Sequence, residues 1–143
     1  EKFGVDAVRS NDGNFTAGPG AFVPVPGTAV PFSMSAAGVA TVESIVTLGD
    51  LLTQNCENVQ IGIRINGTDY PLTVRLIVVG LSGAAEYAIG QCFRFPITLA
   101  AGSYTAELLI RGLMPGEFVG GTGASASVNA TPSIPLIMTV THN

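Results

Sequence analysis

The sequence predicts an all-β protein, an antiparallel β-sandwich of about eight or nine strands. Apolar residues alternate with polar ones at a period of two, and many of them are β-branched or aromatic. Turn signals rich in Gly, Pro and Asn separate the alternating segments at short and even spacings. No segment has the period of a long amphipathic helix. Many short strands joined by such turns are typical of a sandwich or barrel.

The turn signals divide the chain into nine predicted strands. A short helical turn is also predicted over residues 48–54, where Asp50 is a candidate cap. The expected strands cover residues 21–25, 29–34, 38–48, 58–65, 68–79, 86–99 with a break around Gly90, 103–111, 125–130 and 134–141.

The dipeptide Asn66-Gly67 predicts a tight hairpin. Both central residues of a type I′ turn need a positive φ, and Asn followed by Gly meets that need. The register places Arg64 opposite Asp69 as a pair of opposite charges. It places Pro71 opposite Gly62, and because proline has no N–H we expect a sheet edge or a β-bulge there. Counting outward also pairs Ile65 with Thr68, Ile63 with Tyr70, Ile61 with Leu72 and Val59 with Val74.

A second hairpin is predicted around a four-residue loop at 100–103. This loop keeps the apolar residues of both strands on one face, whereas a three-residue loop would oppose Phe95 to Glu107. The register then pairs Leu99 with Tyr104, Ile97 with Ala106, Phe95 with Leu108 and Phe93 with Ile110.

The first twenty residues differ from the rest, so we divide the chain into an N-terminal arm, 1–20, and a single β-sandwich domain, 21–143. Phe3, Val5 and Ala7 alternate with charged or small residues, which indicates a short strand. Stretches rich in Gly and Asn follow it and would act as a hinge. We expect this assembly arm to add a strand to the sheet of a neighbouring copy. The alternatives are packing on its own edge strand and a disordered terminus.

The composition is poor in charge. Charged residues make up 11% of the chain, and six basic against ten acidic side chains give a net charge of -4. This balance provides no basic surface for nucleic acid. No apolar run reaches the roughly 18 residues of a membrane helix. Because few side chains are charged, copies of the chain would repel one another only weakly. With 47% hydrophobic residues the surface would also be unusually apolar, so we expect self-association.

The sequence offers no cluster of side chains for catalysis, cofactor binding or metal binding. His142 is the one histidine, and a place near the chain end is a poor platform for a catalytic triad. The glycine-rich stretch 116–123 lacks the Lys and Ser or Thr of a phosphate-binding loop. The stretch 11–14 lacks the bidentate Glu of a calcium loop. We therefore expect a protein that is not an enzyme.

The cysteines and the sequons bear on the compartment. Cys56 and Cys92 are the two cysteines, and a disulfide between them is predicted, with an intermolecular bond through Cys92 as the alternative. Asn14, Asn66 and Asn129 each begin an Asn-x-Thr sequon and are candidates for glycosylation. These features favour an extracellular, cell-surface or virion location. Because the chain does not begin with Met, we expect it to be either a processed product or a trimmed piece of a longer chain.

The segment from Val59 through Thr141 resembles a known family, and two stretches carry the resemblance. Residues 59–68 form an apolar strand followed by Asn-Gly and the next strand, and residues 99–104 read Leu-x-Ala-Gly-x-Tyr. Both are similar to the C1q/TNF-like jelly-roll heads of bacterial exosporium collagen-like proteins and of phage fibre or capsid-decoration proteins. The resemblance implies a jelly roll, and a trimer is the usual state of the family. Residues 133–136 depart from the aromatic-Gly motif at the end of the C1q pattern, and no functional residues carry over.

These observations favour a structural or assembly protein, such as a virion decoration, a fibre tip or a filament subunit. Its partners would be copies of itself, bound through sandwich faces and the arm. Another structural protein or a surface glycan is a further candidate partner, and no cofactor is expected. The alternative is a monomeric module that binds carbohydrate or protein through loops 82–92 and 112–124.

Overall fold

Eleven strands make up the described part of the chain. The computed structural model describes residues 4–10, 13–17, 20–48, 56–79, 89–112, 126–130 and 136–143. Each of the nine predicted strands is present, which confirms the all-β prediction, and the predicted helical turn lies beyond Leu48 outside the described residues. The strands are β1 (Gly4–Ser10), β2 (Gly13–Ala17), β3 (Val23–Pro24), β4 (Val30–Met34), β5 (Gly38–Leu48), β6 (Cys56–Ile65), β7 (Thr68–Val79), β8 (Ile89–Leu99), β9 (Gly102–Gly112), β10 (Ala126–Ala130) and β11 (Leu136–His142).

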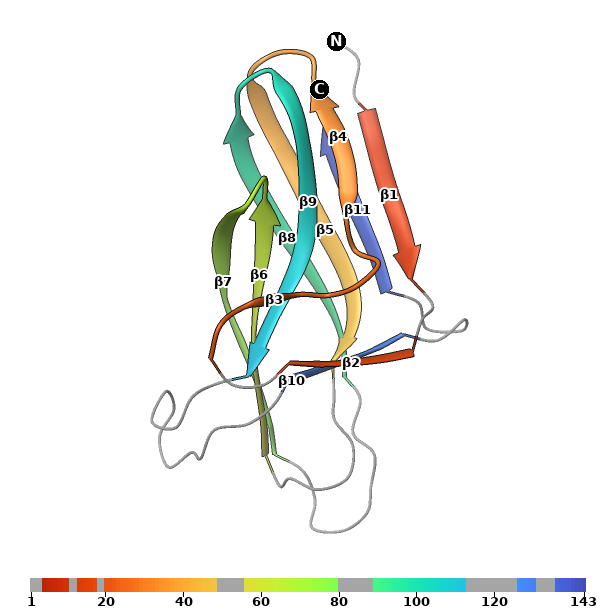
Figure 1. Ribbon diagram of the computed structural model, residues 1–143, viewed down its shortest axis with the longest axis vertical. Helices are drawn as coiled ribbons and strands as arrows, with labels where there is room; N and C mark the ends of the chain where they lie inside the picture. The colour runs from red at the N-terminus through yellow and green to blue at the C-terminus, as the bar shows by residue number, and fades with distance from the viewer. Residues whose placement is uncertain are drawn as a thin grey trace.

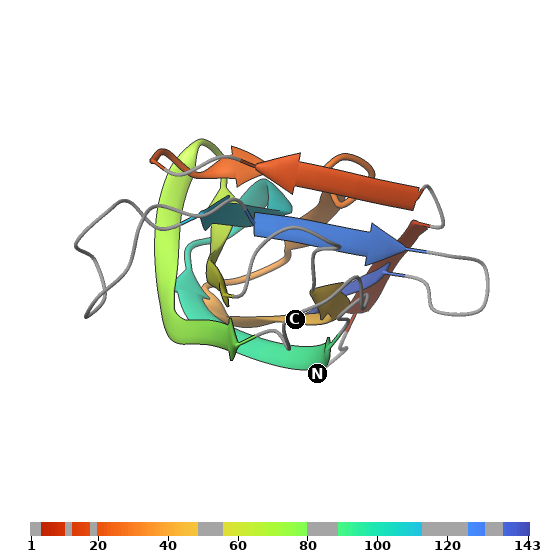
Figure 2. The same cartoon turned by 90° about the horizontal axis from the view of Figure 1, so that it is seen from below.

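The strands form two antiparallel sheets, which we call sheet A and sheet B (Figure 1). In sheet A, β11 and β10 pair with successive parts of one edge of β5, and β8 pairs along its other edge. β1 lies beside β11, while β2 lies beside β10, and these last two run crosswise to the long strands (Figure 1, Figure 2). In sheet B, β3 and β4 both pair with β9, and the order continues through β6 to β7. This arrangement is the predicted jelly-roll-like sandwich.

The N-terminal residues that the structure describes belong to sheet A. β1 pairs antiparallel with β11, beginning with Gly4 opposite His142. Val5 and Ala7 therefore lie in the chain's own sheet, and Phe3 lies outside the described residues. Packing on its own edge strand is the alternative that the sequence leaves open for the arm. Addition to a neighbour's sheet and the domain boundary after residue 20 stay predictions.

The Asn66-Gly67 turn joins β6 to β7 as a tight hairpin. Asn66 has a φ of 47° and Gly67 a φ of 82°, and positive values at both positions define a type I′ turn. The Asn66 side chain also bonds to β9, since its Nδ2 donates to Ser103 O at 3.1 Å and its Oδ1 accepts from the Thr105 N–H at 2.9 Å. The predicted turn and the register beside it are confirmed.

The register of this hairpin changes where β7 carries Pro71. Pro71 lies opposite Gly62 as predicted, on the strand that ends the order of sheet B. A bulge or similar irregularity just beyond Gly62 shifts the pairing. Val59 therefore lies opposite Leu76, so the predicted partner Val74 is wrong, and the predicted pair of Ile61 with Leu72 is not part of the ladder. Proline has no N–H for the ladder, and bulges and sheet edges are the places where a strand tolerates it.

The predicted hairpin between β8 and β9 is wrong, because these strands lie in different sheets. β8 pairs with β5 along its whole length in sheet A, whereas β9 lies between β4 and β6 in sheet B. Tyr104 is opposite Phe32 rather than Leu99, and its hydroxyl donates to Ala100 O at 3.0 Å. Alternation shows which residues face inward, but it does not distinguish a partner beside the strand from one in the facing sheet.

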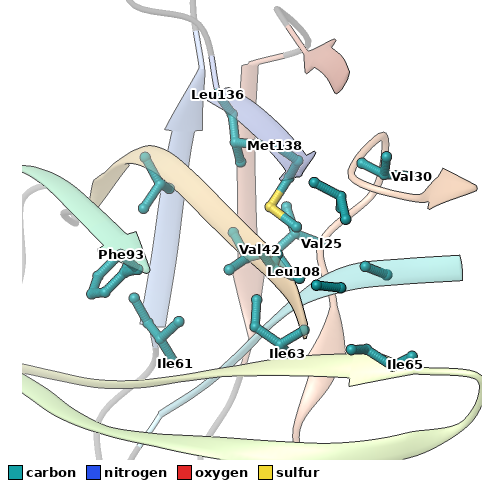
Figure 3. Close-up of a cluster of buried hydrophobic side chains, with 14 of the residues drawn as sticks. Val25, Val30, Val42, Ile61, Ile63, Ile65, Phe93, Leu108, Leu136 and Met138 are labelled. Carbon is teal, nitrogen blue, oxygen red and sulfur yellow. The ribbon is translucent and has the colours of Figure 1, made fainter. Parts of the chain in front are cut away.

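The core lies between the two sheets and consists of the inward residues of the alternating strands (Figure 3). β6 contributes Ile61, Ile63 and Ile65, each at most 3% exposed. Val42 of β5 and Met138 of β11 face them from sheet A and are also buried. The core therefore anchors β5 and β11, the strands that carry the surfaces described below.

Candidate functional site

The outer face of sheet A carries most of the exposed large apolar side chains. We define this face by the side chains that point away from the core, which are odd-numbered in 5–7, 39–45 and 137–141 and even-numbered in 92–98. Three of the four large apolar side chains that are exposed in the described residues belong to it, and the fourth is Val23 of β3. The three are Val5, Val39 and Ile45, which are 65%, 55% and 52% exposed.

Threonine and one ion pair make up much of the rest of this face. Thr139 and Thr141 lie in β11, and Thr41 lies beside them in β5. Glu43 Oε1 is 3.7 Å from Arg94 Nε, with side chains that are 45% and 72% exposed. Such exposed pairs contribute about 0–1 kcal/mol, so the charges do little for the stability of the sheet.

Cys92 lies on the same face, opposite Ile45 in the ladder between β8 and β5. Its thiol is exposed and free, so the predicted disulfide with Cys56 is not formed in the structure. Cys56 begins β6 in sheet B, whereas Cys92 points away from the core on sheet A. The alternative, an intermolecular bond through Cys92, stays a prediction.

The three predicted glycosylation residues lie in the described part of the chain. Asn14 and Asn129 are opposite each other in the ladder between β2 and β10. Asn66 is exposed at the tip of the hairpin, and its amide bonds to β9. Glycosylation at these positions stays a prediction.

A cleft of about 550 Å³ lies among β1, β4, β9, β11 and the β6–β7 turn. Many of its polar side chains already bond within the chain. The Tyr104 hydroxyl donates to Ala100 O, the Asn66 amide bonds to β9, and His142 bonds to Asp6. Few polar side-chain groups of the cleft remain available to form hydrogen bonds with a ligand, so the cleft by itself does not define a binding site. Pro31, Phe32, Ser33, Ser103 and Thr105 complete its lining.

His142 is a titratable group in this cleft and bonds at both ring nitrogens. Its Nε2 lies 2.7 Å from Asp6 Oδ2, and its Nδ1 lies 3.1 Å from Asn143 O. Burial of the ring lowers the pKa of His142, but the hydrogen bond to Asn143 and the hydrogen bond and charge of Asp6 outweigh it, so the pKa lies above its usual value. Sequence reasoning missed this pair, because the register between β1 and β11 is what brings Asp6 to His142.

The described residues provide no group of three or more His, Cys, Asp or Glu side chains that could hold a metal ion. They also include no helix with the length and hydropathy to span a membrane. Of the predicted binding loops 82–92 and 112–124, residues 82–88 and 113–124 lie outside the described residues, as does the glycine-rich stretch 116–123. Residues 89–92 belong to β8 and Gly112 ends β9, so these residues are strand rather than loop. Residues 11 and 12 of the calcium-like stretch are also outside them.

The two sheets define the chain as a jelly-roll β-sandwich. Comparison with solved structures finds a similar fold in a TNF. Eiger TNF from S. frugiperda shares 12% identity with this chain, and the match covers 98% of this chain and 92% of that chain at a TM-score of 0.54. This similarity is one of fold, and it confirms the predicted resemblance to C1q/TNF-like jelly rolls at that level. No protein-family model matches the chain, and no curated protein matches it by sequence.

Two further solved structures are similar at lower TM-scores. The globular domain of zebrafish complement 1qA protein has 9% identity, and the match covers 96% of this chain and 95% of that chain at a TM-score of 0.43. A chain of infectious bursal disease virus, Gx strain, has 16% identity, and the match covers 99% of this chain and 32% of that chain at a TM-score of 0.45. At these scores they add nothing to the fold argument.

Proposed function

We propose that this chain is a non-enzymatic structural or assembly protein whose sandwiches associate through the outer face of sheet A. The observation that carries the proposal is the exposure of Val5, Val39 and Ile45 on one face. Thr41 and Glu43 lie between Val39 and Ile45 on β5, and Thr141 lies between Val5 and β5, so a partner on this face would bury three separate apolar side chains rather than one continuous patch. We propose an extracellular particle or surface as the setting, with a virion decoration, a fibre tip or a filament subunit as the role.

A second copy of the chain is the partner that this face fits. The centre of a protein interface is depleted in charge, and here Glu43 and Arg94 already neutralise each other. A contact between two such faces would bury apolar and threonine side chains. It would keep Glu43 and Arg94 paired, but taking this pair out of water costs free energy that the apolar contacts must offset. The net charge of -4 opposes the approach of a second copy only weakly.

Sedimentation velocity over a concentration series tests the proposal. We expect the wild-type chain to form an oligomer whose population grows with concentration. Ile45→Lys puts a charge on the face, beside Cys92, and should leave the chain monomeric at concentrations where the wild type associates. Ala21→Lys adds the same charge at an exposed position just before β3 of sheet B and should leave association unchanged.

Two outcomes would count against the proposal. A wild-type chain that is monomeric at every concentration would contradict self-association and favour the alternative, a monomeric module that binds carbohydrate or protein. An Ile45→Lys chain that associates as the wild type does would show that another surface, such as the outer edge of β1, makes the contact.

A further inference from the structure

β1 is an edge strand of sheet A, so main-chain hydrogen bonds hold it along one side. It pairs with β11, and it is the first strand in the order of sheet A. Its outward side chains, Val5 and Ala7, belong to the outer face of sheet A, whereas Asp6 points the other way, into the cleft. Because an edge strand has one ladder of main-chain hydrogen bonds, its side-chain contacts contribute a large share of its resistance to local unfolding.

His142 is enclosed by groups from β1 and β4. A Cβ built at Gly4 would lie 2.5 Å from Cε1 of the His142 ring, so the absence of a side chain at Gly4 makes room for that ring against β1. The Phe32 ring of β4 lies on the ring as well, with centroids 5.5 Å apart. The side chain of His142 is 11% exposed, and it therefore links the edge strands of both sheets.

Both nitrogens of this ring face acceptors. Asp6 Oδ2 and Asn143 O are oxygens that accept hydrogen bonds, and they lie 2.7 Å and 3.1 Å from Nε2 and Nδ1. A neutral imidazole carries one N–H and can serve one of them, whereas the imidazolium carries two and serves both. Two acceptor oxygens within hydrogen-bond distance therefore favour the protonated ring over the neutral one.

We propose that protonated His142 is a latch that holds β1 in sheet A, and that loss of this proton loosens β1. The sign follows from the contacts: they favour the charged ring in the folded chain, so their stabilisation is complete at low pH and is lost as the pH rises through the raised pKa of the folded state. The latch is therefore closed below about pH 6 and opens toward mildly alkaline pH.

Among the described residues around the ring, His142 is the group that titrates in this range. Asp6 is the charged group that β1 presents to it. β4 has no ionisable side chain, and from β9 the cleft receives Tyr104, whose hydroxyl donates to Ala100 O. β11 carries no other ionisable side chain, and Glu1 and Lys2 lie outside the described residues.

The latch also bears on assembly, and this step rests on the proposed function. Val5 is part of the outer face of sheet A, and β1 brings it there. A loosened β1 removes apolar area from the face, so we expect the wild-type chain to associate more weakly as the pH rises from about 6 to about 8.5.

Hydrogen exchange measured by NMR tests the latch itself. The chain is kept at a concentration at which it sediments as one species at both pH values, so that association does not enter. After correction for intrinsic rates, protection of the amides of residues 5–8 should fall about three- to tenfold between about pH 6 and pH 8.5, whereas protection of residues 61–65 in the core should not. The midpoint should match the titration of the imidazole signal, which is unambiguous because the chain has one histidine.

Two variants test whether His142 is the group whose titration loosens β1. His142→Gln keeps a donor for Asp6 but has no proton to lose in this range, so protection of β1 should no longer depend on pH. Asp6→Asn removes the carboxylate. The midpoint of the imidazole titration and the midpoint of the change in β1 protection should both move to lower pH. Flat protection in the wild type, or the same pH-dependent fall in His142→Gln, would overturn the latch. The link to assembly would be overturned if protection of β1 falls with rising pH but sedimentation at a higher concentration is the same at both pH values.

Discussion

Asn66 stabilises one end of sheet B through its backbone and its side chain. Its φ of 47° is one that L-residues adopt rarely, and asparagine tolerates it better than most. Its amide bonds to Ser103 O and to the Thr105 N–H, so the hairpin tip is tied to β9. Backbone conformation and hydrogen bonding are therefore separable contributions of one residue.

Two substitutions at Asn66 separate these contributions. Asn66→Gly keeps the positive φ and loses both bonds to β9, so the free energy of unfolding should fall by about 1–2 kcal/mol. Asn66→Ala loses the same bonds and adds the strain of an alanine at positive φ, so its loss should be larger by about 1 kcal/mol. Urea unfolding monitored by circular dichroism gives both values. Equal losses in the two variants would show that φ is not strained at this position.

The turn at Asn66 could be predicted from the sequence, but its bonds to β9 could not. A two-residue turn is a local property, and Asn-Gly specifies it without reference to the rest of the chain. Ser103 and Thr105 are 37 and 39 residues away in the sequence, and the pairing of β6 with β9 is what brings them near. The same reason hid the contact between Asp6 and His142, which are 136 residues apart.

Among the elements, the β6–β7 hairpin carries an ion pair with two hydrogen bonds. Arg64 Nε lies 2.6 Å from Asp69 Oδ1, and Arg64 Nη2 lies 3.1 Å from Asp69 Oδ2. This two-point geometry is the favourable one for arginine and a carboxylate. The hydrogen bond and charge of Arg64 hold the pKa of Asp69 below its usual range.

The stability contributed by this pair should therefore depend on pH. A lowered pKa in the folded state means that the contribution is present above the pKa of the unfolded chain, about 4, and is lost as the pH falls through the folded value. Asp69→Asn should destabilise the chain by about 0.5 kcal/mol at neutral pH, a small value because both side chains are partly exposed to solvent. Urea midpoints of the two chains should converge as the pH falls below about 3. A difference that persists there would show that charge is not its cause.

The two hairpin predictions show what alternation specifies in an element. Near Asn66-Gly67 the turn type sets the register, so the pairs from Ile65 to Gly62 are as predicted. Beyond Pro71 a bulge intervenes, and neither its position nor its size follows from the period of two. For β8 and β9 the alternation is the same in one sheet or in two, and the tertiary packing decides.

At the scale of the whole molecule, the core between the sheets sets stability. Ile63 is 1% exposed and belongs to the buried cluster that both sheets share. Ile63→Ala should lower the free energy of unfolding by about 2–5 kcal/mol, because it removes apolar contacts and leaves a cavity. Val39→Ala, at a position that is 55% exposed, should change it by less than about 0.5 kcal/mol. Comparable losses in urea unfolding at the two positions would mean that Val39 is covered in solution.

The fold class could be predicted from the sequence because the period-two alternation and the turn chemistry agree. The low charge content also predicts association, but not the location of the surface that would take part. The location depends on which strands share a sheet, since Val5, Val39 and Ile45 lie on two strands that are distant in sequence and reach one face through β11.

The antiparallel pairing of β1 with β11 places the beginning of the first described strand beside the end of the last, with Gly4 opposite His142 (Figure 1). Polypeptide attached at either end would leave the sandwich from the same pole. The domain could accordingly sit as an insertion within a host protein without stretching that host's backbone. It could equally be circularly permuted with a short tether between the two ends, and the opposite pole, with β2 and β10, would then point away from the attachment.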